Sequence, residues 1–136
     1  MKKTIIFFIA VMFSATAFSQ TPDTAKKDIN TILEVTNGDY DMGKISIGKS
    51  LEYNVYLKNI STADTLIIQD IRVGCGCTTP KFKTADKILP GKSTFITLGF
   101  NGGSAPGDFS KFADILFRGG LVKQVKFHGT AVPPGQ

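Results

Sequence analysis

Residues 51–58 read Leu-Glu-Tyr-Asn-Val-Tyr-Leu-Lys, and their side chains alternate between apolar and mostly polar. Successive side chains of a strand point to opposite faces, so this period of two predicts a strand with one face in the core. Its expected buried residues are Leu51, Tyr53, Val55 and Leu57. The pattern makes β structure the first expectation for this chain.

Six further segments have the same short, extended character, and turn-forming residues such as Pro90-Gly91 bound them. They cover residues 32–35, 40–45, 65–73, 93–100, 109–117 and 121–130. About seven short strands at this spacing predict an all-β, antiparallel β-sandwich whose last two strands form a hairpin. To its core we assign Ile96, Leu98, Ile115 and Phe127.

The first 19 residues have the pattern of a secretory signal peptide. Lysines at positions 2 and 3 precede an apolar run over residues 4–18, and small side chains precede a cleavage site before Gln20. A bilayer-spanning helix needs about 20 residues, so this run is short for the alternative, an uncleaved membrane anchor. We therefore expect export to the periplasm or secretion, with no stable membrane span in the mature chain.

The remaining sequence divides into one short tail at each end and one domain. The lead-in after the cleavage site is polar and shows no apolar period, which predicts flexibility. The expected boundaries are 1–19 for the signal peptide, 20–31 for the lead-in, 32–132 for the domain and 133–136 for the tail.

Composition argues against several function classes. The 136 residues are 42% hydrophobic and include 16 basic and 11 acidic side chains. Without the two lysines of the signal peptide, the chain has 14 basic and 11 acidic side chains, a net side-chain charge of +3. The basic residues are scattered along the sequence. A nucleic-acid-binding protein would concentrate its basic residues on one stripe, so we expect no nucleic-acid partner. One His and two Cys leave few metal or nucleophile constellations, so we expect neither enzymatic activity nor a cofactor.

The motif that offers reactive side chains is Cys75-Gly76-Cys77, which contains both cysteines of the sequence. After export, two thiols this close can form a disulfide, although an extended strand would point them to opposite faces. The bend that closure requires is permitted by Gly74 and Gly76. A ring this small is expected to be strained and easily reduced.

Three interpretations of Cys75 and Cys77 stay open, and no catalytic residue is assigned. The favoured one is a local disulfide or two packed thiols at a strand end. The second is a redox-active pair. The third is a soft-metal site in which two thiolates bind Cu(I), with Met42 or His128 as further ligands. His128, the single imidazole, is otherwise expected to be a half-exposed sheet residue.

Several motifs occur in the order and at the intervals of a known bacterial family. They are Tyr40-Asp41-Met42-Gly43-Lys44-Ile45, Cys75-Gly76-Cys77-Thr78-Thr79-Pro80, Ile88-Leu89-Pro90-Gly91-Lys92, Pro106-Gly107-Asp108-Phe109-Ser110-Lys111 and His128-Gly129-Thr130-Ala131-Val132. Over roughly residues 32–132 the chain resembles the family catalogued as domain of unknown function 1573. The resemblance implies an immunoglobulin-like β-sandwich in exported proteins, commonly of Bacteroidetes and related bacteria. The family usually has Ser before Cys-Gly-Cys where this chain has Gly74, so no role for a serine is carried over.

Two function classes follow. The family is similar to the sandwich modules of sperm and cilium scaffold proteins, so we expect a non-catalytic cell-envelope module for protein–protein interaction or structural support. Its expected partner is another envelope protein, which would contact sheet edges, end loops or an exposed aromatic patch. The alternative is a Cu(I)-binding or redox protein that uses Cys75 and Cys77.

Overall fold

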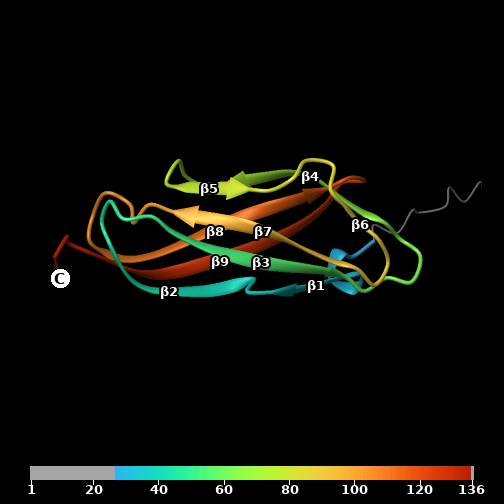
Figure 1. Cartoon of the computed structure of the whole chain (residues 1–136), viewed down its shortest axis with the longest axis horizontal. Coiled ribbons are helices and arrows are strands. Elements are labelled where there is room, and N and C mark those ends of the chain that lie inside the picture. Colours follow the sequence, from blue (N-terminus) through green and yellow to red (C-terminus); the bar gives the residue numbers. More distant parts are fainter. Residues whose placement is uncertain (1–26, 136) are drawn as a thin grey trace, which may run out of the picture.

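The computed structural model describes residues 27–135, which form two β-sheets packed face to face (Figure 1). One sheet has four strands in the order β1 (Leu33–Thr36), β3 (Leu51–Asn59), β7 (Ser93–Phe100) and β5 (Thr78–Lys81). The other has five, in the order β2 (Asp39–Ser46), β9 (Leu121–Val132), β8 (Gly107–Phe117), β4 (Leu66–Val73) and β6 (Lys87–Ile88). The predicted signal peptide lies outside the described residues. Along the part of the chain that the structure describes, no helix has the length and apolar character needed to cross a membrane.

The prediction of an all-β sandwich is confirmed, and the strand count is higher by two. The hairpin of β8 and β9 runs in register from Gly107 opposite Ala131 to Phe117 opposite Leu121. The strands missed in the sequence are β5, which contains Pro80, and β6, which has two residues. Both stand at the edge of a sheet, where a strand this short shows no alternating pattern.

The prediction that all pairs are antiparallel is wrong for β2, which pairs with β9 in parallel. Thr36 at the end of β1 lies opposite Tyr56, and the next side chain, Asn37, donates from its amide to the Asn54 carbonyl. Three residues further on, Tyr40 stacks on Tyr53 with ring centroids 4.3 Å apart. The chain therefore keeps its direction while it passes from one sheet to the other, which produces the parallel pair.

The core lies between the sheets, and all but one of the residues assigned to it are buried. The exception is Leu51, which is 38% exposed. It is the first residue of β3 and follows the largely exposed turn at 47–50, so it lies at the end of the sandwich. At the same end of the strand, burial and the nearby Tyr40 and Asp39 raise the pKa of Tyr53 well above its usual range.

A short helix precedes residue 32, the position at which the sequence analysis places the start of the domain. Asp28 caps a short 3-10 helix, Ile29–Thr31, by accepting a hydrogen bond of 2.9 Å from the Asn30 backbone N–H. Ile29 is buried and belongs to the core. A single apolar residue in a polar stretch has no period, so the sequence pattern did not reveal it.

Candidate functional site

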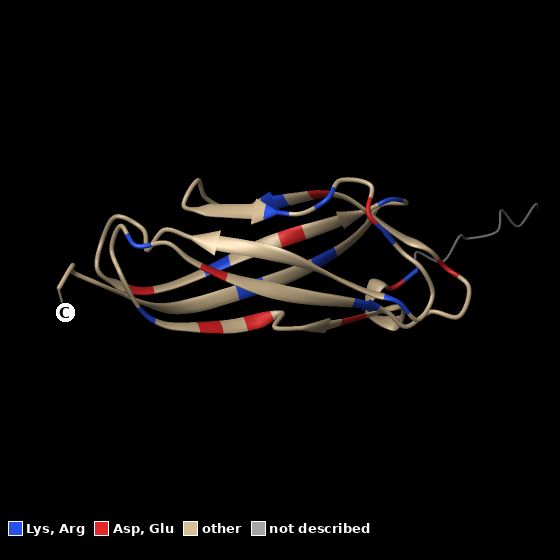
Figure 2. Cartoon of the chain, viewed as in Figure 1, with Lys and Arg blue, Asp and Glu red and all other residues tan. Residues whose placement is uncertain are grey.

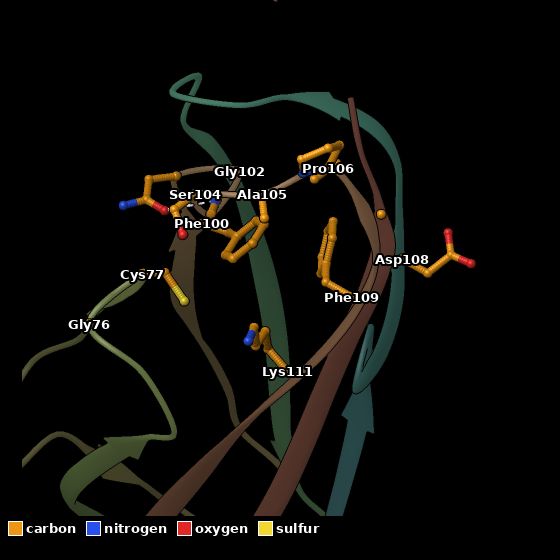
Figure 3. Close-up of a pocket in the computed structure, with 14 residues that line it drawn as sticks. Gly76, Cys77, Phe100, Gly102, Ser104, Ala105, Pro106, Asp108, Phe109 and Lys111 are labelled. Atoms are coloured by element: carbon orange, nitrogen blue, oxygen red, sulfur yellow. Dashed lines mark hydrogen bonds between the residues drawn. The ribbon is translucent and has the colours of Figure 1, made fainter. Parts of the chain in front are cut away.

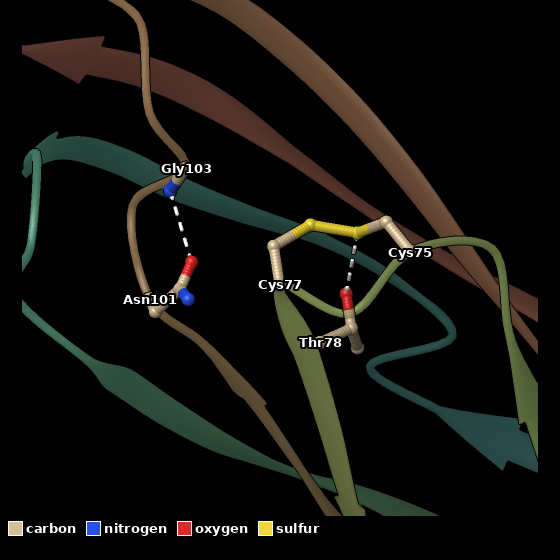
Figure 4. The surroundings of a disulfide bond; sticks show 5 residues. All are labelled: Cys75, Cys77, Thr78, Asn101 and Gly103. Carbon is tan, nitrogen blue, oxygen red and sulfur yellow. Dashed lines mark hydrogen bonds between the residues drawn. A yellow bond between two sulfur atoms is a disulfide. The ribbon is translucent and has the colours of Figure 1, made fainter.

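The two cysteines lie in the connection between β4 and β5, where the chain crosses from the five-stranded to the four-stranded sheet (Figure 4). Cys75 and Cys77 form a disulfide, with their Cα atoms 5.3 Å apart. The Thr78 backbone N–H donates to the Cys75 carbonyl over 3.2 Å, and that of Asn101 donates to the Cys77 carbonyl over 3.2 Å. These bonds tie the cysteine turn to β5 and to the loop that follows β7.

Neither residue considered as a further metal ligand is in this turn. Met42, on β2, is buried in the core. His128, on β9, is half-exposed as expected, with Nε2 3.5 Å from an Asp39 carboxylate oxygen and Nδ1 3.8 Å from one of Asp41. Within residues 27–135, His, Cys, Asp and Glu form no group of three that could hold a metal ion. The Cu(I) interpretation therefore rests on Cys75 and Cys77 alone.

A hollow of about 490 Å³ lies beside the disulfide at one end of the sandwich (Figure 3). Gly76, Cys77 and residues 101–107 are among the residues that line it. Phe100 and Phe109 contribute aromatic rings whose centroids are 4.4 Å apart, and Lys111 lies below them. The segments that meet here are far apart in the sequence, so the motifs did not predict the hollow.

Local backbone geometry fixes the loop side of the hollow. Gly102 has φ of +76°, and a Cβ there would come within 2.7 Å of the Ser46 carbonyl oxygen. Only glycine fits that position. The Asn101 side chain accepts a hydrogen bond of 3.1 Å from the Gly103 N–H, which holds the turn from within.

Lys111 is the residue of this site that the sequence analysis missed. Residues 109, 113, 115 and 117 of β8 alternate toward the core, and position 111 has the same phase. The sequence does contain a signal for Lys111: a charged residue stands in the same phase as the core residues of its strand.

Large apolar side chains are exposed on the outer faces of both sheets. Tyr56 on β3 and Phe95 on β7 lie directly opposite each other, 47% and 55% exposed, with ring centroids 6.1 Å apart. On the outer face of the five-stranded sheet, Phe112 and Val122 are each 46% exposed. Figure 2 shows basic and acidic residues interspersed over both sheets. The aromatic pair is therefore the most distinctive surface feature of the described residues.

The family model "Protein of unknown function (DUF1573)" matches residues 33–130, which confirms the resemblance seen in the motifs. No curated protein matches the chain. The solved structures similar to it include a protein of unknown function from Porphyromonas gingivalis W83, with 15% identity and a TM-score of 0.57. That match covers 73% of this chain and 46% of the other, so the chain spans about half the length of the P. gingivalis protein.

Two single-domain structures are also similar. The ASH/PapD-like domain of human CEP192 is 12% identical with a TM-score of 0.52, and 97% of this chain and 98% of that one are covered. The C. elegans MSP family member WR4 is 5% identical with a TM-score of 0.50, over 74% of this chain and 98% of the other. At these identities the likeness extends to the fold alone.

Proposed function

We propose that this chain, which belongs to the DUF1573 family of proteins of unknown function, is a non-catalytic module exported to the cell envelope. There it binds another envelope protein through the outer face of its four-stranded sheet. The signal-peptide pattern of residues 1–19 supports export. The observation that carries the binding role is the exposed pair Tyr56 and Phe95.

The surroundings of this pair are those of a binding patch. On one side, the Thr97 hydroxyl donates to the Asn54 side-chain oxygen over 2.8 Å, and on the other Lys58 lies opposite Ser93. Aromatic side chains surrounded by polar ones are enriched at the centres of protein interfaces. Full burial of a large apolar side chain contributes roughly 1.5–3 kcal/mol, so covering each of these half-exposed side chains contributes about half of that.

Replacing Tyr56 by Ser and Phe95 by Thr together is expected to abolish partner binding. A photo-crosslinking amino acid at the neighbouring Ser93 would capture the partner in the native envelope, and the adduct would be measured in the periplasmic fraction. We expect the double variant to lose at least about 90% of the adduct, because two central aromatic side chains carry much of the energy of such a patch.

The matched control for this experiment is Phe112→Thr with Val122→Thr, which removes equally exposed apolar side chains from the other sheet. This control is expected to retain the adduct. Equal adduct yields in both double variants would contradict the proposed face. Absence of the protein from the periplasmic fraction would contradict export.

A thiol-based function is the second candidate, because Cys77 is partly exposed and lines the hollow. If the disulfide only fixes the turn, replacing both cysteines by Ser should lower the free energy of unfolding by about 1–3 kcal/mol. The short loop constrains the unfolded chain weakly, and the backbone hydrogen bonds of the turn remain. Denaturant unfolding followed by circular dichroism measures this difference.

A Cu(I) titration of the reduced wild type and the double Ser variant, against a competing chelator, separates the two functions. We expect no tight binding by either protein. Stoichiometric binding by the wild type that the variant lacks would favour the thiol-based function, since a hydroxyl is a poor ligand for Cu(I).

A further inference from the structure

Lys111 occupies an inward-facing position of β8 that its neighbours fill with core residues. Phe109 and Ala113, two residues before and after it, both pack in the core. Lys111 itself is half-buried and lines the hollow beside the disulfide (Figure 3). Lysine is uncommon at inward-facing positions of a strand, which apolar side chains usually fill.

Among the described residues, no carboxylate forms an ion pair with Lys111. The ion pairs among residues 27–135 involve other lysines, one arginine and His128, and none involves Lys111. Asp108 is the one carboxylate among the residues that line the hollow. It accepts a hydrogen bond of 2.7 Å from the Thr130 hydroxyl and points away from the hollow in Figure 3. The ammonium group therefore faces an open space without a counter-ion from these residues.

The rest of the hollow fits the apolar part of a ligand. Phe109 presents its ring to the space, and Pro106 lies above it (Figure 3). The volume of about 490 Å³ is within the range of roughly 300–1,000 Å³ that is usual for small-molecule sites. The Asn101 backbone N–H donates to the Cys77 carbonyl over 3.2 Å, which ties the cysteine turn to the loop after β7 and limits the rearrangement that binding would require.

We infer that this hollow binds a small organic anion with a ring-like body. Its carboxylate or phosphate group pairs with Lys111, and its ring packs against Phe109 and Pro106. The anionic group gives Lys111 the ion-pair partner that the described residues do not supply, and the ring removes apolar surface from water. This site is separate from the aromatic pair on the outer face, so it goes beyond the proposed function and does not depend on it.

Titration of the mature protein followed by two-dimensional NMR of its backbone amides tests the inference. The probes are benzoate and phenyl phosphate, with acetate and inorganic phosphate as their ring-free counterparts. We expect saturable shifts at residues 102–105 and 109–111, and affinities at least tenfold higher for the ring-bearing probes. The tighter of benzoate and phenyl phosphate identifies the anionic group.

Lys111→Met should weaken binding of the ring-bearing probes at least tenfold, and Lys111→Arg should retain it, because only the charge is required. Lys87→Met, at an exposed lysine of β6, is the matched control and should leave the affinity for the probes unchanged. The inference is overturned if neither ring-bearing probe saturates the shifts or if acetate and phosphate bind equally well. Unchanged affinity in Lys111→Met with a native amide spectrum would overturn it too.

Discussion

Replacing Val55 by Asp is expected to unfold the domain. Val55 lies in the middle of β3, opposite Ile96 of β7, and its side chain is completely buried between the sheets. An unpaired carboxylate there loses its hydration and costs several kcal/mol, whether it stays charged or takes up a proton. The whole stability of a domain is only about 5–15 kcal/mol, so this single cost is comparable to it. Circular dichroism with thermal unfolding measures the loss.

The matched control is Val122→Asp, the same chemical change at a position that is 46% exposed on β9. There the carboxylate stays in water, and the expected cost is about 1 kcal/mol or less. A Val55→Asp protein that melts at the wild-type temperature would show that this side chain does not face the core.

Local periodicity explains how much of the fold could be predicted. Residues 53, 55 and 57 are fixed by alternation within one strand, and the β8–β9 hairpin by the tight turn between two such runs. The same alternation applies to β7, where residues 94, 96, 98 and 100 share one phase and Phe95 therefore lies on the opposite face. These features need only the residues next to them.

Other features depend on contacts between distant segments and could not be predicted in the same way. The direction of β2 is set where Tyr40 meets Tyr53, and the two-residue β6 exists because Leu66 and Ile67 pair with it. The hollow forms where the cysteine turn and the loop after β7 come together. The spacing of Cys75 and Cys77 showed that they lie close together. That Cys77 and Lys111 line the same hollow could be seen only in the folded structure.

Asn59 is the clearest case of a residue whose structural role the sequence pattern did not indicate. It stands at the end of β3, where the pattern indicated only the start of a polar connection, yet its side chain is completely buried. Its amide nitrogen donates to the Asp64 carbonyl over 2.6 Å and to the Ile88 carbonyl over 2.8 Å. Its side-chain oxygen accepts from the Ser61 backbone N–H over 3.0 Å and from the Ser61 hydroxyl over 2.7 Å. One side chain thus joins the loop after β3 to β6.

Replacing Asn59 by Ala is therefore expected to lower the free energy of unfolding by about 2–4 kcal/mol, because it leaves two carbonyl groups and one N–H group without these partners. Urea unfolding measures the change. Asn54→Ala is the matched control: Asn54 is half-exposed and its side chain has one hydrogen bond, from Thr97, so about 1 kcal/mol or less is expected. Asn59→Asp should be at least as destabilising as Asn59→Ala, since a carboxylate cannot donate and would face two carbonyl oxygens. Equal stability of the Asn59→Ala and Asn54→Ala proteins would mean that water replaces the buried amide without cost.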